Sequence, residues 1–187
     1  MRYSCILIDP PWAERGGGKI KRGADRHYPL LPTKEMPRVI YGSGVFVPAD
    51  DCHLWLWSTN TFLPDALWLM EALGFRYITN AIWAKNRMGL GQYLRGQHEL
   101  LLLGVRGSGP KVRTERRDLP SLIQAPRRKH SEKPEESYAL IEARSNGPRL
   151  EMFARREREG WDCWGDSILP LLPYPPGQPQ LRQPRDL

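Results

Sequence analysis

The sequence is poor in the residues that build metal centres, disulfide frameworks and membrane spans. Among 187 residues it has four histidines and three cysteines, which are Cys5, Cys52 and Cys163. Cysteines this far apart, two of them in apolar contexts, predict reduced core residues, and we predict no metal site. No apolar run is long enough to span a membrane, and the N-terminus shows no signal-peptide pattern. We therefore expect a cytoplasmic protein without membrane contact.

What the sequence does contain is typical of one globular domain with two basic segments. It is 40% hydrophobic and 26% charged, with a net charge of +7. Residues 15–26 hold five basic residues and one acid, and residues 106–130 hold eight basic residues and two acids. Both segments are rich in Gly or Pro, which predicts loops. Basic loops suit a polyanion such as nucleic acid, and ordinary solvated surface charge is the alternative interpretation.

The first dozen residues combine a predicted buried strand with an acid at its end. Residues 5–8 form an unbroken apolar run, as in a strand that is covered on both faces of a parallel sheet. Pro10 and Pro11 end this strand, because proline cannot donate to a sheet ladder. Asp9 is thereby placed at the carboxyl end of a central strand, where open α/β sheets bind ligands. A rigid exit turn with Trp12 as a core anchor is the structural alternative.

The remaining pattern alternates between strands and helices, which predicts an α/β fold with a mostly parallel sheet flanked by helices. Further strands are expected at residues 53–58, 77–85, 98–105, 119–124, 149–153 and 161–164. Helices are expected at residues 33–40, with Thr33 as cap, at 61–73, with Thr61 as cap, and at 134–144. The glycine-rich residues 14–26 predict a mobile loop and a plausible lid. We place the domain at residues 1–169 and expect the Pro-rich residues 170–187 to be extended or disordered.

The tetrapeptide Asp9-Pro10-Pro11-Trp12 suits methyl transfer to an amino group that is conjugated with a ring. The lone pair of such a nitrogen is delocalised, so the nitrogen is a poor nucleophile. Hydrogen bonds from the amino group to the Asp9 carboxylate and the Pro10 carbonyl would localise the lone pair and aim it. Trp12 offers an aromatic face on which an extruded base would stack.

Four further motifs follow the tetrapeptide in order. They are residues 89–99 (GLGQYLRGQHE), 131–134 (SEKP, with Tyr138 and Ile141-Glu142 after it), 150–155 (LEMFAR) and 161–166 (WDCWGD). Together they resemble the MT-A70 family of adenine-N6 methyltransferases over residues 3–167. The resemblance implies a single Rossmann-like methyltransferase domain with a permuted motif order, and S-adenosylmethionine as the methyl donor.

The resemblance also implies a cofactor pocket. Lys133 would pair with the cofactor carboxylate, and Arg155 would reach the ribose. Asp166 stands where relatives often carry Asn, so it can accept a hydrogen bond there but not donate one. The cofactor-binding residues implied in this way are Asp9, His130, Lys133, Pro134, Phe153, Arg155, Gly165, Asp166 and Ser167. A cation at the start of a helix is disfavoured by the helix dipole, which points to a specific anion near Lys133. Arg155 as a surface residue is the alternative.

A second set of residues is expected to contact the substrate. Tyr28 lies where the family's loop carries an active-site tyrosine, and Trp83 and Lys85 end a strand on the same rim. The substrate-binding candidates are Trp12, Lys19, Tyr28, Trp83, Lys85 and Arg127. The alternative interpretation is that Tyr28 and Trp83 are core aromatics. Trp55, Trp57 and Trp68 are expected in the core.

The sequence therefore predicts an S-adenosylmethionine-dependent enzyme that methylates N6 of adenine in nucleic acid. We favour DNA over RNA, because the chain is small and basic and lacks an appended RNA-binding module. RNA methylation and a non-catalytic nucleic-acid-binding subunit are the alternatives. Protein-glutamine methylation is disfavoured by Asp9 and Trp12, where Asn and Tyr are typical. A homodimer or a partner methyltransferase-like subunit stays open.

Overall fold

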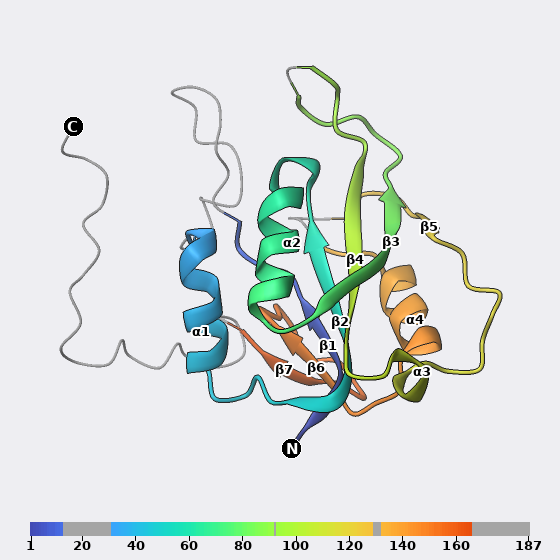
Figure 1. Ribbon diagram of the computed structural model, residues 1–187. Helices are drawn as coiled ribbons and strands as arrows, with labels where there is room; N and C mark the ends of the chain where they lie inside the picture. The colour runs from blue at the N-terminus through green and yellow to red at the C-terminus, as the bar shows by residue number, and fades with distance from the viewer. Residues whose placement is uncertain (13–30, 92, 129–131, 166–187) are drawn as a thin grey trace, which may run out of the picture.

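A seven-stranded sheet lies between two layers of helices in the computed structural model, which describes residues 1–12, 31–91, 93–128 and 132–165 (Figure 1). The strands are β1 (Tyr3–Ile8), β2 (Pro48–Ser58), β3 (Arg76–Ala84), β4 (His98–Arg106), β5 (Leu122–Gln124), β6 (Arg149–Met152) and β7 (Asp162–Trp164). The helices are α1 (Met36–Gly42), α2 (Leu63–Ala72), α3 (Gly109–Val112) and α4 (Glu135–Arg144), with 3-10 turns η2 (Thr33–Glu35) and η3 (Asn60–Phe62).

The strand order is β5-β3-β4-β2-β1-β6-β7. The central strand β1 pairs in parallel with β2 and β6, β6 pairs in parallel with β7, and β3 with β5. Strand β4 runs antiparallel to both of its neighbours, β2 and β3. The prediction of a mostly parallel sheet is confirmed. One strand is reversed because residues 85–97 return as a hairpin connection instead of a helical crossover.

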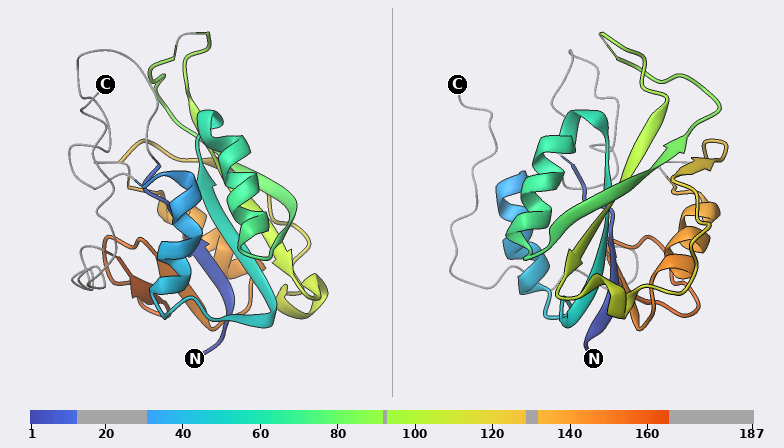
Figure 2. Two further views of the ribbon diagram at one scale, coloured as in Figure 1. Left: turned by 60° about the vertical axis from the view of Figure 1, so that its left-hand side comes forward. Right: turned by 45° about the vertical axis from the view of Figure 1, so that its right-hand side comes forward.

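The apolar run of β1 faces two different cores. Ile6 and Ile8 are fully buried in the cluster that includes residues of α1 and α2, whereas Cys5 and Leu7 are fully buried in the cluster that includes residues of α4. Figure 2 shows α1 and α2 on one side of the sheet and α4 on the other. Successive side chains of a strand point to opposite faces, so burial of both faces removes the usual polar alternation.

The predicted helix caps are wrong in detail. Thr33 does not cap α1, because its Oγ1 donates a hydrogen bond to Asp65 Oδ1 of α2 at 2.8 Å. Thr61 lies inside η3, and α2 begins at Leu63 with a proline in its first turn. Helix α2 ends within one residue of the predicted bound at 73, and Gly74 beyond it takes a φ of +81° that favours glycine.

The cysteines and Trp68 test two further expectations. All three cysteines are free, with Cys5 and Cys52 buried, as predicted. Trp68 is 44% exposed on α2, so its expected core position is wrong. The short helix α3 is not expected from the basic residues 106–130, and its Val112 is buried.

Across the described ranges no helix is long and apolar enough to cross a membrane. The expected loop at residues 14–26 and the expected tail lie outside the described residues.

A buried histidine in β2 makes the stability of this fold depend on pH. His53 is 3% exposed, and its Nδ1 lies 2.8 Å from Ser145 Oγ, which also accepts a hydrogen bond from Trp55 Nε1 at 2.9 Å. Burial, with a smaller contribution from Arg144, lowers the pKa of His53 from 6.5 to about 4. The folded protein therefore holds His53 neutral where the unfolded chain protonates it.

We predict that the free energy of unfolding falls as the pH drops from 6.5 to 4. In this window the unfolded chain binds the His53 proton and the folded chain does not, at a cost of about 3 kcal/mol at the acid end. Urea unfolding of the wild type and of His53→Gln across this range measures the effect. The variant should lose much less stability between pH 6.5 and 4.5 than the wild type does. Equal slopes for the two proteins would contradict the assignment.

Candidate active site

The tetrapeptide at the end of β1 forms a rigid turn at the carboxyl edge of the sheet. The Asp9 amide donates to the Met152 carbonyl of β6 at 3.5 Å, and β1 ends at Ile8, as predicted. The Trp12 amide donates to the Pro10 carbonyl at 2.8 Å, which closes a three-residue turn. Pro10 is buried and Asp9 is half-buried at the rim. The prolines thus fix the direction in which the Asp9 carboxylate leaves the strand.

Trp12 anchors this turn in the core. Its Nε1 donates to the Trp57 carbonyl at 3.1 Å, and its ring stacks on Phe62 with centroids 5.3 Å apart and an interplanar angle of 12°. Only 8% of Trp12 is exposed. In this structure Trp12 takes the core position of the structural alternative, and its role as a stacking face for a substrate base stays a prediction. The large apolar ring gains more from burial against Phe62 than from exposure at the rim.

Four alternating charges run across the carboxyl edge of the sheet, and we call them the charge chain. Lys133 Nζ lies 3.0 Å from Asp9 Oδ1 and 3.2 Å from Glu99 Oε2. Glu99 Oε1 in turn lies 2.5 Å from Lys85 Nζ. All four side chains are between 10% and 18% exposed. The chain joins β1, β3, β4 and the segment before α4 through nearly buried ion pairs.

Two members of this chain, Lys133 and Glu99, are held in the ionised state by their neighbours. Burial opposes the charge of Lys133, but the carboxylates of Asp9 and Glu99 raise its pKa above the usual value. Burial likewise favours neutral Glu99, yet Lys133 and Lys85 lower the pKa of its carboxyl. Lys133 and Glu99 therefore stay charged because their neighbours in the chain are charged. Loss of one member therefore leaves a buried charge without its partner.

Two tryptophans lie beneath the ammonium groups. Lys133 Nζ is 5.2 Å from the centroid of the Trp57 ring, and Lys85 Nζ is 4.7 Å from that of Trp83. Trp83 is 2% exposed and donates from Nε1 to the Ala125 carbonyl at 2.8 Å. Trp83 therefore takes the core position of the alternative interpretation, and its substrate contact stays a prediction. Its ring supports Lys85 by a cation–π contact.

Helix α4 begins directly after Lys133. Pro134 takes the N-cap position and is buried, and its carbonyl accepts a hydrogen bond from Ser137 Oγ at 2.6 Å. The first turn carries Glu135 and Glu136, as the helix dipole favours. The anions that offset the cation of Lys133 at this unfavourable position are Asp9 and Glu99 of the protein itself.

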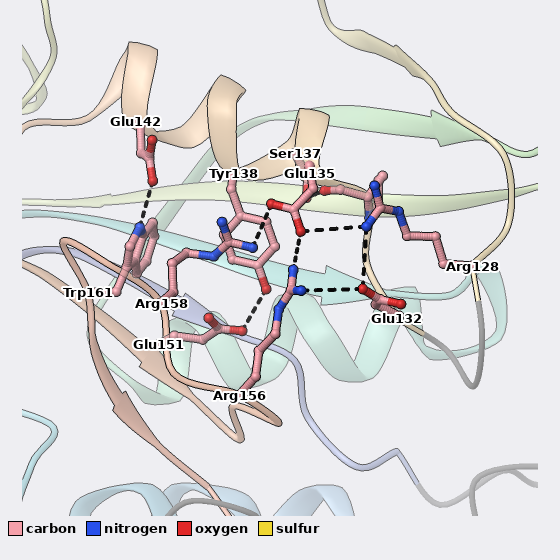
Figure 3. Close-up of polar contacts among 11 residues, drawn as sticks. Arg128, Glu132, Glu135, Ser137, Tyr138, Glu142, Glu151, Arg156, Arg158 and Trp161 are labelled. Atoms are coloured by element: carbon pink, nitrogen blue, oxygen red, sulfur yellow. Dashed lines mark hydrogen bonds and ion pairs between the residues drawn. The ribbon is translucent and has the colours of Figure 1, made fainter.

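An ion-pair network of four partly exposed side chains and the more buried Arg158 ties the start of α4 to the segment after β6 (Figure 3). Glu135 pairs with Arg156 and, at 2.8 Å, with Arg158. Glu132 pairs with Arg156 at 3.6 Å and with Arg128 at 3.4 Å. Single exposed pairs contribute little, but a network of five residues restrains both segments together. The segment that carries Lys133 is therefore held from its outer side as well.

A buried acid lies behind this network on β6. Glu151 is 7% exposed and accepts a hydrogen bond from Tyr138 OH at 2.8 Å. The Arg158 guanidinium lies 3.5 Å from the centroid of the Tyr138 ring (Figure 3). Burial raises the pKa of Glu151 and of the Tyr138 hydroxyl. The cluster forms a polar wall between α4 and β6, close to the charge chain.

The backbone after β6 is strained next to Asp9. Phe153 has a φ of +59°, a left-handed conformation that non-glycine residues rarely adopt. Its ring packs edge-on against Trp164 with centroids 5.5 Å apart. Gly165 lies so close to Ala154 that a Cβ would meet the Ala154 oxygen at 2.1 Å. Phe153, Arg155 and Gly165 therefore gather at the carboxyl ends of β6 and β7, beside β1, and Arg155 is half-buried there.

The remaining predicted site residues divide into two groups. Lys85 lies at the site, but as a member of the charge chain rather than as an open substrate contact. Arg127 is exposed, and its amide donates to Asn86 Oδ1 at 3.1 Å, which places it beside the connection between β3 and β4. The other predicted residues lie outside the described residues; these are Lys19, Tyr28, His130, Asp166 and Ser167.

Glu99, which links the two lysines, has no role among the residues predicted from the sequence. It belongs to a motif on which the resemblance rests, but that motif carries no assigned function. The available signal is an acid at the start of an apolar strand, at the edge where Asp9 is expected. The site roles of Trp57, Tyr138 and Glu151 are missed in the same way, because only the packing of α4 on the sheet brings Trp57 beneath Lys133 and Tyr138 beside Glu151.

The fold and this site together define a class of protein. A mixed seven-stranded sheet with helices on both faces, and an acid after the central parallel strand, is the architecture of a Rossmann-like methyltransferase. The MT-A70 family matches residues 3–167, so the chain belongs to this family. The predicted resemblance and the predicted fold class are both confirmed.

Several curated relatives share this similarity. Type II methyltransferase M.MunI of Mycoplasma sp. is 32% identical over 191 residues, which cover 89% of this chain and 78% of that protein. The N(6)-adenosine-methyltransferase catalytic subunit METTL3 of Homo sapiens and the N(6)-adenine-specific methyltransferase METTL4 of Mus musculus are each 29% identical over 89% of this chain. The chain spans only 28% of the former and 38% of the latter.

We predict that Glu99→Gln destabilises the fold by about 3 kcal/mol, because Lys85 and Lys133 lose the carboxylate between them. Urea unfolding at neutral pH measures the change. Glu71→Gln is the matched control, since Glu71 is exposed on α2, and its effect should stay within about 0.5 kcal/mol. A Glu99→Gln protein as stable as the wild type would show that the charge chain does not restrain the site.

Proposed function

We propose that this protein methylates the N6 amino group of adenine in nucleic acid, with S-adenosylmethionine as the donor. The observation that carries the proposal is the Asp9 carboxylate, which Pro10 and Pro11 hold at the end of β1, 3.0 Å from the ammonium of Lys133. Membership of the MT-A70 family supports the reaction. The relatives named as N(6)-adenine and N(6)-adenosine methyltransferases support the position that is methylated.

The residues at this edge fit the charged end of S-adenosylmethionine. Its amino-acid part carries one carboxylate and one ammonium, and Lys133 and Asp9 present the complementary charges side by side. The Trp57 ring lies beneath Lys133, and its buried Nε1 has no hydrogen-bond partner within the described part of the chain. Lys133 would hold the carboxylate and Asp9 the ammonium. When bound, S-adenosylmethionine supplies an electrophilic methyl group.

The turn at the end of β1 orients the nucleophile. The Asp9 carboxylate accepts a hydrogen bond from the adenine amino group. The Pro10 carbonyl accepts a second one through the lone pair that the Trp12 amide leaves unused. These acceptors draw electron density onto N6 and aim its lone pair. Carboxylates are weak bases in water, so we assign Asp9 orientation rather than proton removal.

The polymer and the compartment are also part of this proposal. We place DNA before RNA, because the chain matches 78% of the relative named a type II methyltransferase and only 28% of the one named an adenosine methyltransferase. The three free cysteines suit the reducing cytoplasm. One relative is named a catalytic subunit, so a second copy or a partner subunit stays within the proposal.

We predict that Asp9→Ala lowers adenine methylation by roughly 100-fold or more, because the main acceptor for the amino group is lost. Purified protein is incubated with labelled S-adenosylmethionine and single-stranded DNA, duplex DNA or RNA, and the nucleosides are then analysed. The RNA arm tests the alternative polymer directly. Asp50→Ala is the control, because Asp50 is exposed and pairs with Arg2 at the opposite edge of the sheet. Methyl-adenine formation by Asp9→Ala at the wild-type rate would contradict the mechanism.

We predict that Lys133→Gln weakens S-adenosylmethionine binding by roughly 10- to 100-fold, since a charge-assisted contact to the carboxylate is lost. Isothermal titration calorimetry without nucleic acid measures the dissociation constant. Lys111→Gln is the matched control, because Lys111 is exposed on α3 and pairs with Asp51 away from the site. Unchanged affinity in a folded Lys133→Gln protein would remove Lys133 from the cofactor pocket.

A further inference from the structure

The connection between β3 and β4 exposes apolar side chains that the proposed function has not used. Met88, Leu90, Tyr93 and Leu94 are 68%, 74%, 99% and 86% exposed. We call these four residues the hairpin tip. Large apolar side chains gathered this openly on one projection mark a binding surface more often than an accident of packing.

The hairpin tip extends from the edge of the sheet that carries the charge chain. Strand β3 ends at Ala84 and β4 begins at His98, so Lys85 and Glu99 lie at the base of the connection. Through Glu99 and Lys133 that base is joined to Asp9. Figures 1 and 2 show the connection projecting beyond the helices, on the side of the molecule away from the N-terminus.

Backbone contacts give the projection a defined shape. The Gly89 amide donates to the Gly96 carbonyl at 2.6 Å, and the Gly96 amide donates to the Leu90 carbonyl at 3.2 Å. Gly91 packs so tightly that a Cβ would meet the Leu94 oxygen at 1.9 Å. A shape that is set before binding lowers the entropy that binding must overcome.

The charge of the connection identifies the kind of partner. Arg87 and Arg95 are exposed on either side of the tip, and residues 86–98 contain no acid. The exposed Arg127 is joined to the same segment through Asn86. A symmetric contact between two copies would bring these cations together, which is unfavourable. Aromatic and apolar groups between cations match the stacked bases and phosphates of a nucleic-acid strand.

We propose that the hairpin tip binds the nucleic-acid strand beside the methylated adenine, with Tyr93 and Leu94 against the faces of neighbouring bases and Arg87 and Arg95 on phosphates. This inference rests on the proposed function, since it assigns that substrate a second contact. Because Trp12 is stacked inside the core, Tyr93 offers an exposed aromatic ring for these neighbouring bases, on a hairpin that begins beside the charge chain.

Binding of a fluorescein-labelled single-stranded DNA, followed by anisotropy, tests the stacking contact. Tyr93→Ala should weaken binding roughly 5- to 100-fold, and Tyr93→Trp should restore it, because stacking depends on the ring. Tyr77→Ala is the matched control, because Tyr77 is a 41% exposed tyrosine near the opposite end of β3. Its affinity should equal that of the wild type.

The salt dependence of the same binding tests the phosphate contacts. The double variant Arg87→Gln/Arg95→Gln should lower the slope of log affinity against log salt by about 1.4, the value for two phosphate contacts on a single strand. Tyr93→Ala should leave this slope unchanged. An unaltered slope in the double variant would remove the arginines from the proposal.

The outcomes separate this inference from the proposed function. A wild type that methylates adenine while Tyr93→Ala binds and reacts equally well overturns the inference alone. If Tyr93→Ala weakens DNA binding but the wild type transfers no methyl group, the inference is supported and the proposed function is contradicted. Absence of any nucleic-acid binding overturns both. Dissociation of a wild-type dimer by Tyr93→Ala in size-exclusion chromatography would assign the tip to a protein contact and overturn the inference.

Discussion

The structure around the site depends on keeping the ammonium of Lys133 charged while it is almost buried. An isolated cation in that position would lose its hydration without compensation, so the chain supplies two carboxylates from different strands. Asp9 comes from the central strand and Glu99 from the reversed strand β4. The arrangement requires β1, β4 and the start of α4 to meet at one edge of the sheet. The charge of Lys133 therefore depends on the topology of the sheet, because only this strand arrangement brings both carboxylates to it.

This constraint also links the site to its surroundings. Glu99 extends the charge chain to Lys85 at the base of the hairpin, and the Glu132 and Glu135 pairs extend the restraint to the segment after β6. That segment carries the left-handed Phe153 and the half-buried Arg155. A strained conformation persists when its neighbours over-determine it, as the packing of Trp164 and the network on its outer side do here. The proposed nucleic-acid contacts of the hairpin and the proposed cofactor contacts after β6 are thus connected through the same set of ion pairs.

The elements of this fold are easier to predict from the sequence than the roles of their side chains. Residues 5–8 are predictable as a doubly buried strand, because a short apolar run without alternation is typical of strands covered on both faces. Thr33 and Thr61 match the pattern of helix caps. In the structure, however, the Thr33 hydroxyl donates its hydrogen bond to Asp65, and Thr61 is a residue of the 3-10 turn η3. Trp12 follows a strand and Trp83 lies near the end of one, and these positions predict that both side chains are exposed at the rim of the site. Their indole N–H groups instead find backbone carbonyls in the core.

The sequence by itself determined the strand with Asp9 at its end, the family and the pairing of Lys133 with an anion. The strand and the pairing follow from local rules, namely the apolar run, the two prolines and the cation at a helix start. Only the tertiary structure decided that the anions are Asp9 and Glu99, that β4 is reversed, and that Trp57 lies beneath Lys133. Residues 9, 99 and 133 are far apart along the chain, and no local pattern records which of them share one edge of the sheet. The long-range packing of α4 on the sheet decides that, because it alone brings Lys133 within 3.2 Å of both carboxylates.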